Sequence, residues 1–298
     1  MDNIMNELNF WMVSVLVANL LIALLAIFCF RALQGVFAGV NVKGELSEKD
    51  NPAFGLAVAG GVLALCIILS SAVGGEAYVS LVSEVINTSI YAIAGVIFLK
   101  VGMVLNDKVF FSSFSVPQAL RDKNIGVGLI QGANLIAISI IVHSAINWVD
   151  VENWTGIGAV AAVFIAGQLI LFLVTLLRIQ IYKKRNNGAS WQSAIQSGNT
   201  ALSIRYAGQI LGTSIAVSGV AGIINYLPGY IGMAALYWFA YSVGIMIILW
   251  GLYRISLPVL LAKIDIVKEV DVEKNNAIAY IEAAIFIGWA LILSTLLT

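Results

Sequence analysis

The stretch NIGVGLIQGANLIAISIIV, residues 124–142, carries no charged residue and is apolar along most of its length. A helix needs about 20 predominantly apolar residues to cross the hydrocarbon core of a bilayer. The strands of a membrane β-barrel are about ten residues long and alternate between apolar and polar positions, which this stretch does not do. It therefore predicts a transmembrane helix.

The whole chain has the composition of a membrane protein. Its 298 residues are 60% hydrophobic and 11% charged, with a mean hydropathy of +0.96, whereas soluble domains are about half apolar and about a quarter charged. We therefore expect an all-α integral membrane protein with eight transmembrane helices. Hydropathy predicts these spans at residues 10–30, 51–73, 82–104, 124–142, 154–177, 200–223, 230–253 and 277–297.

The basic residues cluster at alternate connections between these spans. They are Arg31, Lys43 and Lys49; Lys100, Lys108, Arg121 and Lys123; Arg178, Lys183, Lys184, Arg185 and Arg205; and Arg254, Lys263, Lys268 and Lys274. Positive charge is retained on the cytoplasmic side, so we expect both termini to be periplasmic. The net charge is zero, and no basic–aromatic pattern predicts nucleic-acid binding.

Every second span begins in the same way. The four starts read DNPAFGLAVAGG from Asp50, KNIGVGLIQGAN from Lys123, GNTALSIRYAGQ from Gly198 and NNAIAYIEAAIF from Asn275. Asn is a strong helix N-cap because its side chain accepts a hydrogen bond from an unpaired backbone amide. We therefore predict helix caps at Asn51, Asn124, Asn199 and Asn276. Because each copy holds two spans, the four copies should be parallel repeats related by an axis along the membrane normal.

Small residues follow each of these Asn residues on one helical face. Eight residues after the Asn stand Ala59, Gly132, Ala207 and Ala284. Small residues let helix backbones approach closely in lipid, so the pattern predicts a packed seam. The fourth copy departs from it at Tyr280 and Leu291, which predicts looser packing there. Both cysteines, Cys29 and Cys66, lie within spans and are expected to be buried.

Ionisable residues inside spans are costly and suggest function, and the best candidates are Arg205 and Glu282. Arg205 and Glu282 each stand six residues after the Asn of their copy, and we hypothesise that they pair. Such a pair could fix helix register, or it could serve gating or solute binding. The neutral polar residues Gln131, Asn134 and Gln209 could line a polar cavity with them, or could form ordinary hydrogen bonds between helices.

Motifs for known chemistry are missing from the sequence. It contains no P-loop, HExxH or GxSxG motif, and its two cysteines and single histidine lack metal-site spacing. We therefore expect no catalytic residues, no bound metal and no cofactor, and a protein that is not an enzyme.

Short motifs in both halves carry a family resemblance. They are Asn199-Thr200-Ala201 with Gly208 and Gly212, and Asn51 with Gly60 and Ser70-Ser71-Ala72. With these motifs the chain resembles the YjfL-type family of bacterial inner-membrane proteins, a family of unknown function. A typical member has four spans, so the resemblance implies two four-helix units in tandem, residues 1–150 and 151–298. It also implies a multi-pass location in the bacterial inner membrane and an association with envelope stress.

These observations favour one function and leave a second open. The first is a non-enzymatic membrane component of an envelope-maintenance or stress-related assembly. Its expected partners are the lipid bilayer, cytoplasmic or membrane proteins, and further copies of the chain. The alternative is a transporter or channel for a small solute or ion, with a polar site between the repeats. A continuous hydrated path would favour transport, and a dry seam would favour the first function.

Overall fold

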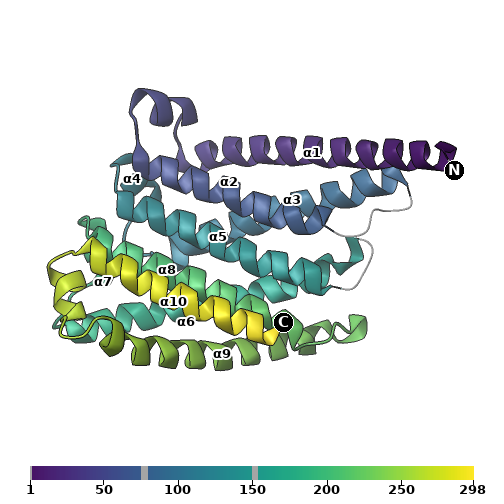
Figure 1. The fold of residues 1–298 in the computed structure, drawn as a ribbon. Coiled ribbons are helices and arrows are strands. Elements are labelled where there is room, and N and C mark those ends of the chain that lie inside the picture. Colours follow the sequence, from purple (N-terminus) through teal and green to yellow (C-terminus); the bar gives the residue numbers. More distant parts are fainter. Residues whose placement is uncertain (1, 75–79, 150–153) are drawn as a thin grey trace.

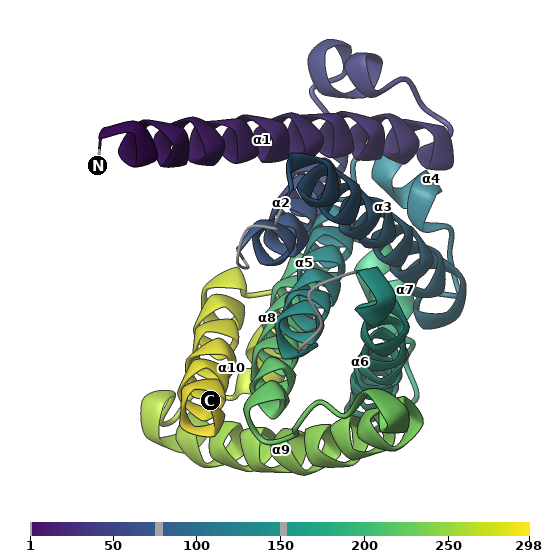
Figure 2. The same ribbon diagram turned by 90° about the vertical axis from the view of Figure 1, so that its right-hand side faces the viewer.

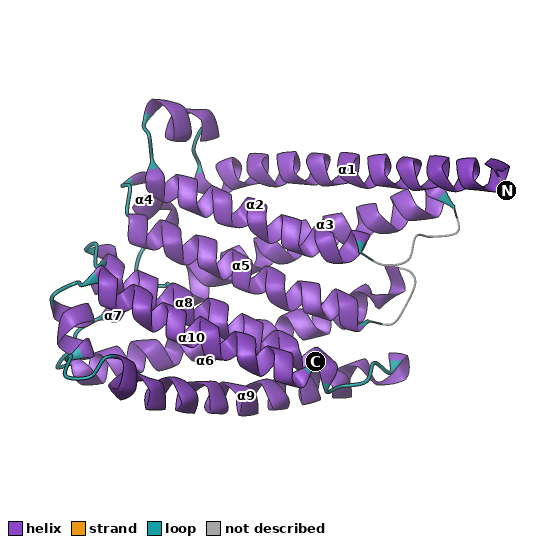
Figure 3. Cartoon of the chain, viewed as in Figure 1, coloured by secondary structure: helices purple, strands orange, loops and turns teal. Residues whose placement is uncertain are grey.

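The computed structural model describes residues 2–74, 80–149 and 154–298, and within these ranges every regular element is a helix (Figure 3). The longer helices are α1 (Asp2–Ala38), α2 (Pro52–Val73), α3 (Leu81–Leu105), α5 (Ile125–Trp148), α6 (Ile157–Arg185), α8 (Thr200–Ser218), α9 (Ile231–Leu260) and α10 (Asn276–Leu297). Between them lie the short helices α4 (Val116–Arg121) and α7 (Trp191–Gln196). The remaining turns are the π-helical η1 (Gly44–Glu48), η2 (Asn106–Phe110) and η6 (Lys268–Val272), and the 3₁₀ turns η3 (Trp154–Gly156), η4 (Gly219–Gly222) and η5 (Pro228–Tyr230).

The centre of the molecule is a row of four helices. Helix α2 packs on α5, α5 on α8, and α8 on α10, as the two perpendicular views show (Figures 1 and 2). The outer helices flank this row: α1 and α3 pack against α2, and α6 and α9 lie on the side of α5, α8 and α10. The row is made of the four helices whose starts repeat in the sequence.

Seven helical segments in the described part are long and apolar enough to cross a membrane. They are Phe10–Val36, Pro52–Val73, Leu81–Phe110, Ile125–Trp148, Ile157–Arg185, Pro228–Leu260 and Asn276–Leu297. The chain is thus an all-helical, multi-pass type of membrane protein. The sixth predicted span, residues 200–223, is not among the seven; it forms α8 and η4, and α8 carries Arg205 and Gln209 on a largely buried surface.

Asn side chains cap all four helices of the row, and one prediction needs correction. Asn51, Asn124 and Asn199 accept hydrogen bonds from the backbone amide three residues on. In the fourth copy the cap is Asn275, which accepts from the amides of Ala277 and Ile278, whereas Asn276 is already helical. Because Asn275 and Asn276 are adjacent, the repeat pattern could be counted from either residue in the sequence.

The backbone before each cap identifies the frame. The preceding residue has a left-handed conformation in every copy, with φ of 44° at Asp50, 60° at Lys123, 87° at Gly198 and 58° at Lys274. This conformation is uncommon for residues other than glycine, so its recurrence marks the same turn four times. It places Asn275, and not Asn276, in the position of the other three caps.

The corrected frame also restores the small-residue pattern of the fourth copy. Positions four, eight and fifteen residues after Asn275 are Ala279, Ala283 and Ala290. The predicted departure at Tyr280 and Leu291 was therefore wrong, because it came from counting one residue too late. Both of those side chains are exposed on α10.

The seam brings helix backbones into direct contact. A methyl group built on Gly60 of α2 would collide with the backbone of Gly132 on α5, and one built on Gly208 of α8 would collide with Ala283 on α10.

The cysteines, by contrast, are not part of the core. Cys29 and Cys66 are both exposed, so their predicted burial was wrong; each lies on a helix face that the described helices leave open.

The cap residues also join each copy to the next. The Asn51 amide donates to the carbonyl of Leu120 at 2.8 Å, that of Asn124 to Ile195 at 3.1 Å, and that of Asn199 to Val270 at 3.3 Å. Each acceptor lies four or five residues before the cap of the following copy. All four caps consequently lie at the same end of the bundle (Figure 1).

Candidate functional site: a buried charged cluster

Arg205 of α8 lies between two carboxylates from other segments. Its Nε is 2.6 Å from Oε2 of Glu282 on α10, and its Nη1 is 2.6 Å from Oδ1 of Asp271 in η6. The three residues are between 3% and 7% exposed. Hydrogen bonds between ionised groups are the shorter and stronger ones, so Arg205 ties α8 to both α10 and the turn that precedes it.

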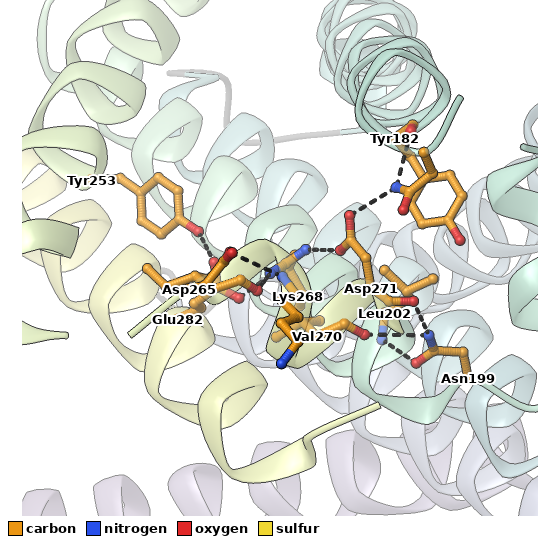
Figure 4. Close-up of polar contacts among 12 residues, drawn as sticks. Tyr182, Asn199, Leu202, Tyr253, Asp265, Lys268, Val270, Asp271 and Glu282 are labelled. Atoms are coloured by element: carbon orange, nitrogen blue, oxygen red, sulfur yellow. Dashed lines mark hydrogen bonds and ion pairs between the residues drawn. The ribbon is translucent and has the colours of Figure 1, made fainter. Parts of the chain in front are cut away.

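The remaining polar atoms of this cluster are largely satisfied. Nη2 of Arg205 donates to the carbonyl of Ile266 at 3.2 Å, and the Tyr253 hydroxyl donates to Oε1 of Glu282. Asn186 donates to Oδ2 of Asp271 at 3.0 Å. Figure 4 shows Tyr253 directed at Glu282, and Asp271 directed at the end of α6 near Tyr182. Removing a partner from such a buried network is costly because it leaves another charge unpaired.

Arg178 of α6 adds a second buried cation. Its guanidinium lies 4.3 Å from the centroid of the Trp250 ring, a favourable cation–π distance. Its Nε and Nη2 have no hydrogen-bond partner within residues 2–74, 80–149 and 154–298. Together with Arg205 and Asp271 it lines a pocket near the cap end of α8. The pocket has room for about one water molecule and for no larger ligand.

The structure divides the predicted polar set into separate places. Arg205 and Glu282 are brought together. Asn134 instead donates to Asn106 at the end of α3, at 2.7 Å. Gln131 lines a different small pocket, between α2 and the α3–α4 region. Gln209 is 1% exposed, and neither of its side-chain polar atoms has a hydrogen-bond partner in the described part of the chain.

The reason given for the Arg205–Glu282 pair was only partly correct. Counted from the true caps, Arg205 is six residues into its copy and Glu282 is seven. The two are therefore not equivalent positions. They meet because α8 and α10 are neighbours in the row, with cap ends at the same end of the bundle.

Sequence reasoning missed Asp271, Arg178 and Tyr253. The sequence did contain a signal for Asp271. This residue stands four positions before the cap Asn275, and the residues four positions before the second and third caps are the apolar Leu120 and Ile195. A charged residue at an otherwise buried position indicates a buried partner. No comparable signal marks Arg178, because it was counted with the basic residues at the end of a span.

The comparisons with known proteins give a family. The family model described as Domain of Unknown Function (DUF350) matches residues 5–146 and again residues 151–297. The chain belongs to this family. It holds two DUF350 units in tandem: α2 and α5 lie in the first match, and α8 and α10 lie in the second. The point at which we divided the chain, between residues 150 and 151, lies outside the described residues.

The charged cluster belongs entirely to the second DUF350 unit. Counted from the caps, the first unit has uncharged residues at the equivalent positions. They are Ala57 and Ile130 for Arg205, Ser47 and Leu120 for Asp271, and Val58 and Gln131 for Glu282. No curated protein and no solved structure matches the chain.

Proposed function

We propose that this protein is a non-enzymatic scaffold of the bacterial inner membrane, serving an envelope-maintenance or stress-related assembly. In this proposal eight helices cross the bilayer as four parallel two-helix repeats. The four Asn caps face the cytoplasm and both termini face the periplasm. The cytoplasmic turns that precede the caps are the contact sites for protein partners. The link to the envelope rests on the family resemblance described above.

The main support for the scaffold proposal is the seam between the row helices, where helix backbones touch. Gly128 of α5 approaches the backbone of Ala53 so closely that an added methyl group would collide with it. Gly60 and Gly132 form the next contact along the same pair of helices. Backbones in contact leave no space for a file of water, and packing of this kind is what stabilises helix association in lipid.

Burial supports the inclusion of α8 as an eighth crossing. Its 19 residues span about 28 Å at the rise of an α-helix, close to the thickness of the hydrocarbon core. Most of its side chains are buried, between α5, α6, α9 and α10. A helix shielded by other helices can carry polar residues that a lipid-facing helix could not, which accounts for its lower hydropathy.

The charged cluster supports a structural role. Each of the three nitrogens of the Arg205 guanidinium donates to a carboxylate or a carbonyl, so Arg205 holds η6 and α10 against α8. Basic residues lie in the connections that precede the caps, and positive charge is retained on the cytoplasmic side of a membrane. This supports a cytoplasmic location for the cap end of the bundle, where the charged cluster lies.

The test is a flux assay in proteoliposomes with a panel of inorganic ions, amino acids and sugars. The scaffold proposal predicts fluxes equal to those of protein-free liposomes for the whole panel. Flux of any member above that level, abolished by a substitution inside the row such as Gly132→Leu, would contradict it.

One observation favours transport as the second candidate. Arg178 is buried beside Arg205, and among the described residues its Nε and Nη2 have no hydrogen-bond partner; ionisable residues within membrane-spanning helices often mark substrate or ion pathways. The corresponding test is chloride flux with Arg178→Gln and, as a control, Arg254→Gln on the exposed surface of α9. Flux that is lost only in Arg178→Gln would establish transport in place of the scaffold.

A further inference from the structure

We propose that copies of this chain associate head to tail, with α10 of one copy packed against α2 of the next. The contact would repeat the one that α5 makes with α8 inside the chain. It concerns a surface outside the charged cluster and goes beyond the scaffold role. The inference rests on two small-residue faces that recur in all four repeats and on hydrogen bonds that join successive repeats. These faces and bonding groups remain unmatched at the two ends of the row.

The first feature is a forward face, which each row helix presents to the helix that follows it. It comprises the residues two, nine and thirteen positions after the cap, and all of them are Ala or Gly. They are Ala53, Gly60 and Ala64 in α2; Gly126, Ala133 and Ala137 in α5; Ala201, Gly208 and Gly212 in α8; and Ala277, Ala284 and Gly288 in α10. The face is buried in α2, α5 and α8, but Ala277 and Ala284 are exposed in α10, and nothing lies within 4 Å of a methyl group built on Gly288.

The second feature is a backward face, which receives the preceding helix. It comprises the residues four, eight and fifteen positions after the cap, which are again small. They are Gly55, Ala59 and Cys66 in α2; Gly128, Gly132 and Ser139 in α5; Ser203, Ala207 and Ser214 in α8; and Ala279, Ala283 and Ala290 in α10. This face is buried or half-buried in the last three helices. In α2 both Ala59 and Cys66 are exposed.

The third feature is hydrogen bonding between successive row helices: a bond at the cap end of all three contacts, and a bond at the far end of the α2–α5 and α5–α8 contacts. At the cap end, the Asn amide donates to the turn before the next cap, as described above for Asn51, Asn124 and Asn199. Among the described residues, the side-chain amide nitrogen of Asn275 donates to Glu269 of its own turn alone, at 2.7 Å. Asn51 bonds both its own Glu45 and the next copy, so the Asn275 amide retains one hydrogen for a further copy.

At the far end of the α2–α5 and α5–α8 contacts, a hydroxyl twenty residues after the cap donates to the carbonyl that stands nineteen residues after the cap of the next helix. In the third copy the hydroxyl position is Gly219, so the α8–α10 contact has no such bond. Ser71 donates to His143 at 3.1 Å, and Ser144 donates to Ser218 at 2.7 Å. The corresponding hydroxyl of α10 belongs to the exposed Thr295, which donates to the carbonyl of Leu291 in its own helix, and the corresponding carbonyl on α2 belongs to the exposed Ser70. The two ends of the row thus carry the kinds of donor and acceptor that form this bond in the α2–α5 and α5–α8 contacts.

The two DUF350 units of the chain already make a contact of the kind proposed between chains. The α5–α8 contact joins the last row helix of one DUF350 unit to the first row helix of the next. A contact from α10 to α2 of a second copy joins the same two kinds of helix. Because the two faces differ, the association is heterologous and leads to a ring or a longer row. In lipid, close packing and interhelical hydrogen bonds are what such a contact requires.

Cysteine crosslinking in membranes tests the contact. In a Cys29→Ser, Cys66→Ser background, one tagged chain carries Ala59→Cys and a second, differently tagged chain carries Ala284→Cys. These positions correspond to Gly132 and Gly60, which touch in the α2–α5 contact. Oxidation should give a disulfide-linked species that carries both tags at twice the 31.8 kDa mass of one chain.

Two control combinations define the outcomes. Ala59→Cys with Ile247→Cys, an exposed position on α9, should give no linked species. Ala59→Cys with itself should also give none. Efficient crosslinking of two Ala59→Cys chains would mean a symmetric contact and would overturn the proposal. Absence of the mixed species, together with a monomer mass for the unmodified protein in mild detergent, would overturn it as well. Neither result depends on whether the protein transports a solute.

Discussion

The side-chain amide of Asn199 donates to the backbone carbonyl of Val270, 71 residues further along the chain, at a distance of 3.3 Å. The same side chain caps α8 by accepting from the amide of Leu202. One residue thus begins a helix and joins two copies of the repeat. The caps of the first two copies do the same.

The caps should therefore differ in their contribution to stability. Replacing an N-cap Asn by Ala costs about 1 kcal/mol, and each lost hydrogen bond between copies costs about 1 kcal/mol more. Asn199→Ala should lower the free energy of unfolding more than Asn275→Ala, which loses its cap and a bond within its own turn. Thermal denaturation in detergent measures both; equal losses would show that the bonds between copies do not contribute.

Arg205 should be much harder to replace alone than together with its partners. Arg205→Met leaves Asp271 and Glu282 buried without their cation, which should cost about 3–5 kcal/mol. The triple variant Arg205→Met, Asp271→Asn, Glu282→Gln removes all three charges and should recover much of that loss. Denaturation midpoints distinguish the two, and a triple variant no more stable than the single one would argue against charge as the cause.

Because Asp271 also contacts Arg205, it affects the result expected when the charges of Arg205 and Glu282 are exchanged. Exchanging Arg205 and Glu282 would place a carboxylate at position 205 beside Asp271, and like charges in contact are unfavourable. The exchange should restore stability only in an Asp271→Asn background. Rescue by the exchange with Asp271 intact would mean that the Arg205–Asp271 contact, at 2.6 Å, contributes little.

Gly60 should tolerate no side chain. Gly60→Ala places a methyl group against the backbone of Gly132, and overpacking of this kind costs about 1–3 kcal/mol. The control is Gly244→Ala on α9, where nothing lies within 4 Å of the added methyl group; it should be neutral or stabilising, because Ala favours helix. Similar denaturation temperatures for the two variants would contradict direct backbone contact in the seam.

The turn before the first cap should lose stability in acid. Hydrogen bonds from Lys49 and Asn51 lower the pKa of Glu45 below its ordinary value of 4.5. A carboxylate whose pKa is lowered by folding stabilises the protein above its unfolded pKa, and this contribution is lost as the pH falls through the folded pKa. The stability difference between the wild type and Glu45→Gln should therefore be constant above about pH 4.5 and shrink below it. A difference that does not change with pH would rule out this role for the Glu45 charge.

The sequence predicted the architecture better than the site. Hydropathy and the repeated Asn identified the helical membrane class and the row helices, because both are local properties. The cap of the fourth copy was misassigned because Asn275 and Asn276 are adjacent; the capping hydrogen bonds of Asn275 and the backbone conformation of Lys274 identify Asn275 as the cap. Asp271 and Tyr253 were missed because their partners are brought close by packing between helices distant in sequence. Gln131 and Asn134 were grouped with Arg205 for polarity alone, although they point to other neighbours.

The central claim is that four parallel repeats cross the membrane with their caps on the cytoplasmic side, and cysteine accessibility tests it most directly. Single cysteines would replace Lys49, Asp122, Ser197 and Glu273, exposed residues two positions before each cap, and Leu227 in the exposed connection between α8 and α9. In a cysteine-free background, a membrane-impermeant maleimide should label the first four positions only from the cytoplasmic side and Leu227→Cys only from the periplasmic side. Labelling of the Ser197 and Leu227 positions from the same side would show that α8 does not cross, and would contradict the account.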